Sequence, residues 1–321
     1  MHPELRGWVE FLGIEAPVLT LVHGNQESRR YYRIENKTKK FMVVDASHCK
    51  ESVPTFIGIA LRLKETEVRT PRVRSFELHK GFMLQDDIGS MHLIDTCASS
   101  NPATYYDKAI ATLVEMQKAP TVELSAIEVG DLIDEMNLMV EWYLKKHLGK
   151  TIECVEGRIL LEGFMQIAKE VMAQPQETFV HRDYHSKNLM IESGDAIVVM
   201  DFQDACQGPL TYDLVSLLRD AYVSLDYRER KRLMMLYREL KGIEVDEMTF
   251  LRWCDFTSMQ RNMKLLGAFA QQHHEGGKEG FIEYTPLLVQ YILDAASNYP
   301  ELEGLVSMLT PEESDSEGFF L

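Results

Sequence analysis

Residues 181–188 read HRDYHSKN, and residues 196–204 read AIVVMDFQD. The first stretch places Asp183 and Asn188 five residues apart, and the second ends an apolar run on Asp201. Phosphoryl transfer needs a carboxylate that accepts the proton of the attacking hydroxyl, and an Asn and a second carboxylate that hold Mg²⁺ on the phosphates. An ordinary loop followed by a hairpin strand is the simpler interpretation, but chance seldom supplies every part at this spacing. The stretch therefore predicts phosphoryl-transfer chemistry.

Length and charge limit the class of protein. The chain has 321 residues and a net charge of −16, from 34 Lys+Arg against 50 Asp+Glu. This length predicts one large domain or two lobes, and a hydrophobic content of 45% allows a large core. Nucleic acids and anionic membranes require a basic surface, so we expect neither as a partner. The acidic balance could favour a cationic substrate, although many proteins are simply acidic.

The cysteines and the N-terminus indicate the compartment. The chain has five widely spaced cysteines without a C-x-x-C pair, Cys49, Cys97, Cys154, Cys206 and Cys254. This spacing suits a reducing compartment and gives no zinc signature. The N-terminus lacks the apolar region of a signal peptide, and no apolar run approaches the roughly 20 residues of a membrane span. We therefore expect a cytoplasmic protein, and the sequence leaves its oligomeric state open.

The first part of the chain is mainly extended. Helical spacing of apolar residues appears only at residues 5–14 and 51–64. Strand patterns occupy residues 19–34 with a turn at Gly24 and Asn25, 40–45, 71–78 and 81–86. The pattern changes near residues 87–90. This change predicts a nucleotide-binding lobe at residues 1–88 and a catalytic and substrate-binding lobe at residues 89–321.

Beyond residue 100 the pattern is mainly helical. We expect helices over residues 102–118, 131–146, 158–173, 210–221, 227–241, 246–270 and 286–295. A stripe of methionines, including Met136 and Met139, indicates core packing rather than a metal or haem site. The acidic tail at residues 310–317 is expected to be mobile.

The motifs together resemble a known family. HRDYHSKN and MDFQD look like the catalytic core of the aminoglycoside phosphotransferase-like small-molecule kinases, which are relatives of the protein kinases. The resemblance covers nearly the whole chain, through SRRYYR, FMVVDAS, GFMLQDDIG, GPLTYDLVSLLRDAY and QRNMKLLGAFA. It implies an α+β, two-lobed, protein-kinase-like fold. The smaller N-terminal lobe would be an antiparallel sheet with one long helix, and the larger C-terminal lobe mainly helical.

The resemblance is closest to the bacterial anomeric sugar kinases of cell-wall recycling, which phosphorylate N-acetylmuramic acid and N-acetylglucosamine at the C1 hydroxyl. It implies ATP and Mg²⁺ as cofactors and a small-molecule sugar as the acceptor. Asp183 would be the base, and Asn188 and Asp201 the metal ligands. Two alternatives remain open: an aminoglycoside or other amino-alcohol phosphotransferase, and a nucleotide-binding pseudokinase.

Further residues are candidates for contact with the acceptor. Tyr184, His185 and Asp204 flank the motif where an acceptor would lie. Asp204 could bind sugar hydroxyls or could simply solvate the loop. A substrate carboxylate or acetamide could be bound by the polar residues of QRNMK, for which a charged helix surface is the alternative, namely Arg261, Asn262 and Lys264.

The nucleotide side departs from the kinase pattern at one position. Asp45 lies where kinase-like enzymes usually carry a Lys that pairs with the ATP phosphates, although the closest subgroup also lacks that Lys. A cation must still offset the phosphate charge. We expect Arg30 to do so, with Ser28 beside it in the SRRYYR turn.

Adenine would be held by the connector after the last strand of the N-terminal lobe. Leu84, Gln85 and Asp87 lie at this position, where the family uses mainly backbone groups. Two other residues are expected to support the catalytic loop rather than to react, His181 from inside the loop and Asp213 by hydrogen bonds.

Overall fold

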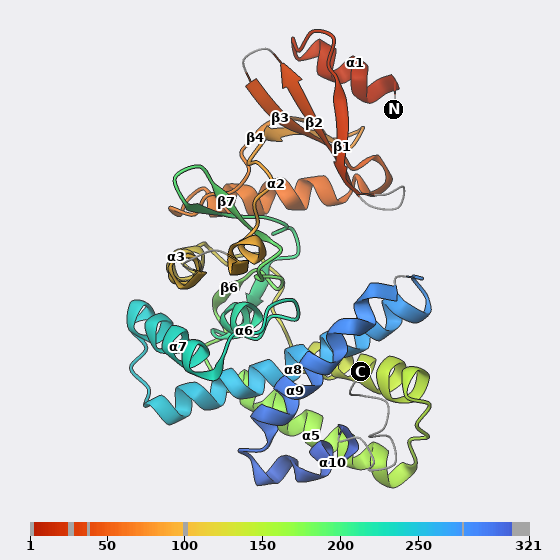
Figure 1. Cartoon of the computed structure of the whole chain (residues 1–321), viewed down its shortest axis with the longest axis vertical. Helices are drawn as coiled ribbons and strands as arrows, with labels where there is room; N and C mark the ends of the chain where they lie inside the picture. The colour runs from red at the N-terminus through yellow and green to blue at the C-terminus, as the bar shows by residue number, and fades with distance from the viewer. Residues whose placement is uncertain (1–2, 25–28, 37–38, 99–101, 278, 310–321) are drawn as a thin grey trace. The chain divides into compact units, whose positions relative to one another are not determined.

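The computed structural model describes residues 3–24, 29–36, 39–98, 102–277 and 279–309. Figure 1 shows the chain with many of its helices and strands labelled. The chain divides into two compact units. Unit 1 is Met1–Pro120 with Lys187–Ala205, and unit 2 is Thr121–Ser186 with Cys206–Leu321. The functional boundary expected after residue 88 concerns nucleotide and acceptor binding, and it stays a prediction.

An antiparallel sheet of five strands forms the N-terminal part of unit 1, as the sequence predicted. Its order is β1-β2-β3-β5-β4, with β1 (Leu19–His23), β2 (Arg30–Asn36), β3 (Lys39–Asp45), β4 (Val73–Glu77) and β5 (Phe82–Asp86). Helix α1 (Pro3–Phe11) packs its buried Leu5 and Trp8 against the sheet core, which contains Ile34 and Val43. Burial of this apolar stripe attaches the short helix to the sheet.

Two helices and a hairpin complete unit 1. The helices are α2 (Ser52–Leu63) and α3 (Pro102–Met116), and the hairpin pairs β7 (Leu189–Glu192) with β8 (Ala196–Val199). Gly194 and Asp195 turn the hairpin with positive φ angles of 91° and 62°. The hairpin carries both predicted metal ligands at its open end, because Leu189 pairs with Val199 and the ligands lie one and two residues further out.

Helices dominate unit 2. They are α4 (Val129–Leu138), η3 (Met139–His147), α5 (Cys154–Met172), α6 (Tyr212–Leu218), α7 (Tyr227–Lys241), α8 (Glu247–His274), α9 (Thr285–Ala296) and α10 (Glu303–Leu309). One small sheet pairs β6 (Thr178–Val180) with β9 (Cys206–Gly208). The two-lobed pattern predicted for a kinase-like α+β fold is therefore confirmed.

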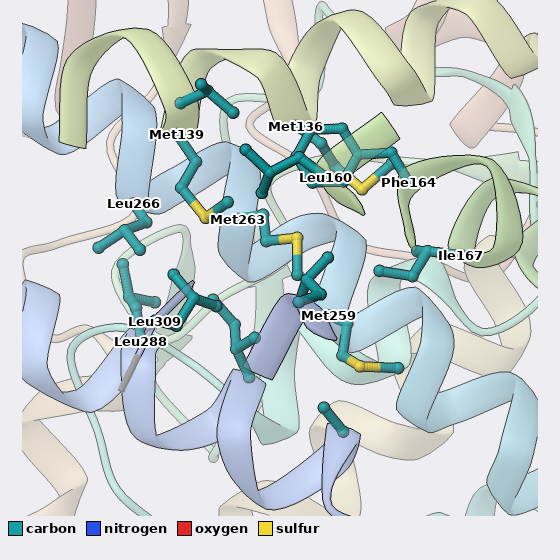
Figure 2. Close-up of a cluster of buried hydrophobic side chains, with 14 of the residues drawn as sticks. Met136, Met139, Leu160, Phe164, Ile167, Met259, Met263, Leu266, Leu288 and Leu309 are labelled. Carbon is teal, nitrogen blue, oxygen red and sulfur yellow. The ribbon is translucent and has the colours of Figure 1, made fainter. Parts of the chain in front are cut away.

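The methionine stripe is core, as expected. Figure 2 shows Met136, Met139, Met259 and Met263 packed with leucines and Phe164 inside unit 2. Each of these methionines is fully buried. Flexible thioether chains fill irregular gaps between helices, which suits a core built from α4, η3, α5 and α8.

Several local features differ from expectation. Residues 131–146 were predicted as one α-helix, but Met139–His147 forms a π-helix, η3. The β6–β9 pair and α10 were not predicted. Short 3₁₀ turns also occur, at η1 (Ser47–Cys49), η2 (Leu93–Ala98), η4 (Glu279–Tyr284) and η5 (Pro300–Leu302). The acidic tail predicted at residues 310–317 lies outside the described residues.

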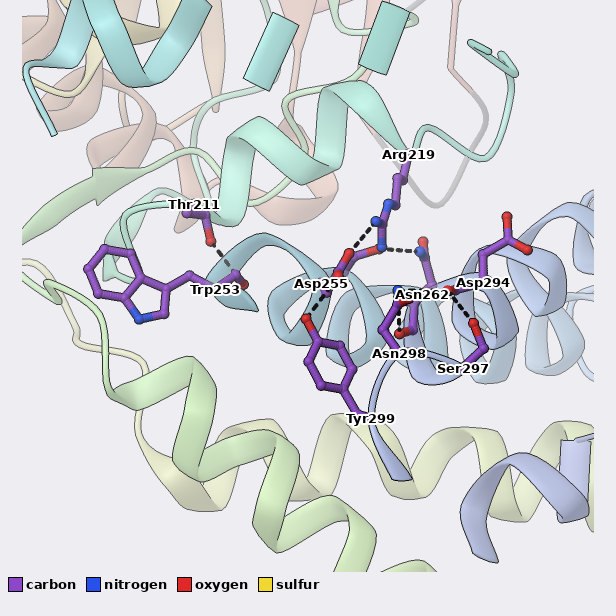
Figure 3. A network of polar contacts seen from close by, with 11 residues as sticks. Thr211, Arg219, Trp253, Asp255, Asn262, Asp294, Ser297, Asn298 and Tyr299 are labelled. Carbon is purple, nitrogen blue, oxygen red and sulfur yellow. Dashed lines mark hydrogen bonds and ion pairs between the residues drawn. The ribbon is translucent and has the colours of Figure 1, made fainter. Parts of the chain in front are cut away.

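A polar network ties the end of α6 to α8 (Figure 3). Arg219, which follows α6, forms an ion pair with Asp255 of α8, and Tyr299 donates its hydroxyl to the same carboxylate at 3.0 Å. The guanidinium donates to one carboxylate oxygen and the phenol to the other, so both oxygens of this half-buried Asp have a partner. Among the helices described, none is both long and apolar enough to cross a bilayer.

Candidate active site

Asp213 fixes the backbone of the loop that carries Asp183 by hydrogen bonds. Asp213 is fully buried in the first turn of α6, and it accepts hydrogen bonds from the backbone N–H groups of His181 at 2.6 Å and Arg182 at 3.0 Å. Arg182 has φ 75°, a left-handed conformation that costs a non-glycine residue energy. Asp213 therefore supports the loop as predicted. Burial raises the pKa of Asp213 to about 6, against the opposing effects of His181 and these hydrogen bonds.

Asp183 lies in a cationic environment. Burial alone would raise the pKa of its carboxyl, but Arg261, His185, His181 and Lys264 together outweigh that effect and lower it. The backbone N–H of Asp183 donates to Nδ1 of the buried His181 at 3.3 Å. The carboxylate is therefore ionised at neutral pH, which is the state required to accept a proton.

The QRNMK segment lies inside the protein rather than on a charged surface. Arg261 is 3% exposed and Asn262 is 1% exposed, within α8. The Nε and Nη1 atoms of Arg261 are buried and have no hydrogen-bond partner among the described residues. A buried guanidinium with unsatisfied donors is costly unless a ligand completes it. Asn262 instead donates to the Ser258 hydroxyl at 3.0 Å, one turn earlier in the helix.

Glu135 of α4 organises two cations and was not foreseen from the sequence. It forms ion pairs with Arg182 of the catalytic loop and with Lys264 of α8, the latter at 2.7 Å. It also accepts a hydrogen bond from Gln260 at 2.9 Å. Glu135 precedes the buried Met136 and lies at the edge of the apolar face of α4. This position beside the apolar face was the one sign in the sequence that its charge could be half-buried.

Tyr184 and His185 differ in their surroundings. Tyr184 is fully buried with its ring 5.9 Å from that of His181, a position that suits packing beneath the loop better than contact with an acceptor. His185 is half-buried, and burial lowers its pKa to about 4, so the imidazole is neutral at pH 7. Its ring lies 5.3 Å from that of Tyr222. The buried Asp220 accepts from the backbone N–H of Ser186 at 2.9 Å and closes the loop.

The predicted metal ligands meet at the open end of the β7–β8 hairpin. The backbone carbonyl of Asn188 accepts the N–H of Met200 at 2.9 Å, which places Asp201 next along the facing strand. Asp201 is exposed and has φ 57°. Gln203 donates its Nε2 to Asp201 and to Asp204, both at 3.1 Å. Hard oxygen atoms on a strained, exposed backbone are the kind of donor set that suits Mg²⁺.

Two adjacent arginines have different partners. Arg30 pairs with the buried Asp45 at 2.6 Å, so the Asp in place of the usual Lys has a cation of its own. Arg29 donates to Gln203 at 2.9 Å and to the Ser52 hydroxyl at 2.8 Å. Successive residues of an extended chain point to opposite sides, which explains why neighbours in SRRYYR separate in this way.

The role of Arg29 was not predictable from the sequence, because its partner Gln203 lies far along the chain. Its guanidinium lies over the ring of Phe56 at 5.3 Å, and Phe56 stacks on Phe202 at 4.6 Å. Arg29 thus reaches the Asp-Phe segment that carries Asp201. Ser28 lies outside the described residues.

Of the residues expected in the connector, Leu84 and Gln85 lie within β5, which pairs with β3 as far as Asp86, and only Asp87 follows that strand. Leu84 belongs to the core beneath α1, and Gln85 is 2% exposed with its Nε2 lacking a hydrogen-bond partner among the described residues. Asp87 accepts two hydrogen bonds from Arg33, at 2.6 and 3.0 Å, and one from the N–H of Gly89. The Asp87 carboxylate is therefore occupied, and its role in adenine binding would fall to the backbone.

The chain matches the model of the phosphotransferase enzyme family over residues 18–253. It is 31% identical to an N-acetylmuramate/N-acetylglucosamine kinase of Pseudomonas aeruginosa, over 96% of this chain and 92% of that protein. It is 29% identical to a kinase of the same name from Neisseria meningitidis, over 98% of this chain and 96% of that one.

Solved structures share the fold at low identity. A choline kinase of Streptococcus pneumoniae superposes with a TM-score of 0.65 at 11% identity, covering 93% of this chain and 100% of that chain. An ADP-bound aminoglycoside phosphotransferase superposes with a TM-score of 0.63 at 12% identity, covering 97% and 100%. At these identities the likeness concerns the architecture alone.

Proposed function

The chain belongs to the phosphotransferase enzyme family and is a small-molecule kinase, and we propose that it transfers the γ-phosphoryl group of ATP to the anomeric C1 hydroxyl of N-acetylmuramic acid or N-acetylglucosamine. The observation that carries this proposal is the ionised Asp183, whose pKa is lowered by Arg261. The buried Nε and Nη1 of Arg261 have no hydrogen-bond acceptor among the described residues. A full-length relationship at 31% identity to a kinase named for these sugars supports the choice of acceptor.

Asp183 is the proposed base. An anomeric hydroxyl is more acidic than an ordinary alcohol, so a carboxylate with a lowered pKa can accept its proton late in the transfer. Arg261 would donate to an anionic or amide group of the acceptor, which would satisfy its two unpartnered nitrogens. Lys264, Asn262, His185 and Asp204 remain proposed contacts of the acceptor, whereas the fully buried Tyr184 is assigned to packing.

Asn188 and Asp201 would hold Mg²⁺, which when bound offsets the charge of the phosphates. The donor set fits, because both residues offer oxygen atoms at one end of the same hairpin and Asp201 is exposed. We assign phosphate binding to Arg30, to Ser28 and, in addition, to Arg29, which reaches the Asp201 segment through Gln203.

Leu84, Gln85 and Asp87 are the proposed adenine contacts. The buried Nε2 of Gln85 has no partner among the residues described, which fits a position that a ligand completes. Residues 1–88 would then form the nucleotide-binding lobe and residues 89–321 the catalytic and acceptor lobe.

The test is ATP consumption with N-acetylmuramic acid, N-acetylglucosamine, kanamycin and choline, with the phosphorylated position read by phosphorus NMR. We expect turnover of the two sugars with phosphate on C1. Asp183→Asn should abolish it, whereas Asp195→Asn, at the exposed turn of the β7–β8 hairpin, should not. Turnover only with kanamycin or choline would overturn the sugar assignment. ATP binding without turnover of any acceptor would favour a pseudokinase.

A further inference from the structure

Three histidines from two helices converge in unit 2, away from the residues assigned above. His147 is the last residue of η3, and His273 and His274 are the last two of α8. One ring nitrogen of each lies within 4.8 Å of the others. The ring centroids are 6.0 Å apart for His147 and His273, 5.6 Å for His147 and His274, and 4.9 Å for His273 and His274.

The backbone brings these rings together by two unusual features. The π-helical turn closes with the N–H of Leu148 donating to the carbonyl of Tyr143 at 2.9 Å. π-Helical turns are rare in proteins, and those that occur often lie at functional sites. Gly267 lets α8 approach the start of η3, because a Cβ there would lie 2.4 Å from the backbone nitrogen of Met139. The C-terminal turns of α8 consequently run beside the end of η3.

The chemistry of the cluster points to a cation rather than to packing alone. Nδ1 of His273 is buried and has no hydrogen-bond partner within the described part of the chain. His147 and His274 bring a second and a third ring nitrogen to the same point. A neutral imidazole is a ligand for transition metals, and a set without carboxylates disfavours Mg²⁺ and Ca²⁺.

We propose that His147, His273 and His274 bind one divalent transition-metal ion of the zinc, cobalt or nickel type. Three imidazoles leave a fourth position of a tetrahedral site open to water. Small side-chain rotations suffice, because the ring nitrogens already lie within 4.8 Å of one another. The bound ion joins the end of α8 to the end of η3.

This ion acts on α8 at a distance from the catalytic residues. His273 lies nine residues beyond Lys264, or roughly 14 Å along the helix axis. The site therefore holds the end of the helix that carries Arg261 and Lys264, and it takes no part in the reaction itself. Its effect is on the stability of unit 2.

The experiment uses the full chain without a polyhistidine tag, stripped of metal with a chelator and kept in excess Mg²⁺. Co²⁺ is titrated by calorimetry and by visible absorption, and Zn²⁺ by thermal unfolding. We expect one Co²⁺ per chain, the absorption bands of tetrahedral Co²⁺, and a higher melting temperature with Zn²⁺. His79→Ala, which removes an exposed histidine between β4 and β5, should bind like the wild type.

His147→Ala/His274→Ala should bind at least about tenfold more weakly and lose the absorption bands, since losing even an outer partner of a metal costs about 10- to 100-fold. Should this double variant fail to fold, His274→Gln tests the same point, because His274 is exposed and its change leaves the core intact. Equal affinity of wild type and His274→Gln, or Co²⁺ binding without tetrahedral bands, would overturn the site.

Discussion

The carboxylates of the two units differ in how completely the protein surrounds them. In unit 2, Asp213 is fully buried with two backbone donors, and Asp183 lies among four cationic or imidazole groups. In unit 1, Asp201 is exposed, and Gln203 is the side chain that donates to it. The fold therefore surrounds Asp183, the proposed proton acceptor, with charged and imidazole groups before any substrate binds. Asp201, the proposed metal ligand, is in contrast accessible to a cation from solution.

The largest expected effect is that of a change at Asp183 of unit 2 on kcat. Asp183→Asn removes the proton acceptor but keeps the size of the side chain, so kcat should fall about 10²- to 10⁴-fold. The KM values should change little, because the loop remains held by Asp213. Steady-state kinetics measures both. A fall of less than tenfold would show that the carboxylate is not essential, and the contrast between the units would lose its basis.

The burial of Asp213 also predicts a pH-dependent stability. Its pKa is about 6 in the folded protein against 3.8 in the unfolded chain, so the folded state binds more protons between these values. Its contribution to the free energy of unfolding is present below pH 4 and falls by roughly 3 kcal/mol as pH rises to 6. The pKa of His185 is about 4 in the folded protein against 6.5 in the unfolded chain, so its contribution to the free energy of unfolding rises with pH over the same range.

Urea unfolding from pH 4 to 7 separates these two terms. The contributions of Asp213 and His185 to the free energy of unfolding should nearly cancel in the wild type between pH 4 and 7. The Asp213→Asn variant should become more stable as pH rises, because only the contribution of His185 remains. His185→Gln should lose stability over the same range. Parallel curves for wild type and Asp213→Asn would contradict the assignment.

At the exposed Asp201, the change Asp201→Asn should raise the Mg²⁺ concentration for half-maximal activity by about 10- to 100-fold. Excess Mg²⁺ should restore part of the activity, because the backbone conformation is retained by Asn. Asp195→Asn is a matched control, since this exposed Asp also has a left-handed φ, 62° against 57°. An equal Mg²⁺ requirement in both variants would remove Asp201 from the metal site.

The smallest kinetic effect is expected for Arg29, and it distinguishes this residue from its neighbour Arg30. Arg29→Ala should raise the KM for ATP by about tenfold, with little change in melting temperature. Arg30→Ala should instead destabilise the protein by about 3–5 kcal/mol, because it leaves Asp45 buried without a counter-charge. The double variant Arg30→Ala/Asp45→Asn removes that penalty. If its KM for ATP equals that of the wild type, Arg30 serves the fold and not the phosphates.

The helices and strands and the kinase family could be predicted from the sequence, because both depend on local spacing. The sheet, the long helices and the methionine core follow from periodicity. The π-helix was not predictable in this way, because its apolar pattern suits an α-helix equally well. Glu135 and Arg29 were missed because their importance comes from partners 47 and 174 residues away.

The QRNMK segment shows the limit most clearly. Charged and amide side chains at helical spacing usually mark a solvated face, yet Arg261 and Asn262 are buried. Their burial depends on how many helices surround α8, and this depends on packing between distant segments. The burial of these residues is therefore a property of the tertiary structure, and their contact with the acceptor stays a prediction.

The burial of α8 has a consequence for how substrate preference can diverge among relatives. Eight consecutive residues of this helix, from Phe256 to Met263, are all buried, so more than two turns have no solvent-facing side. Every substitution there must be accommodated by surrounding helices at the same time. Relatives that bind a different acceptor should therefore change this stretch only together with residues of the surrounding helices. Amides of residues 256–263 should also be among the last to exchange with deuterium, since only global opening exposes them.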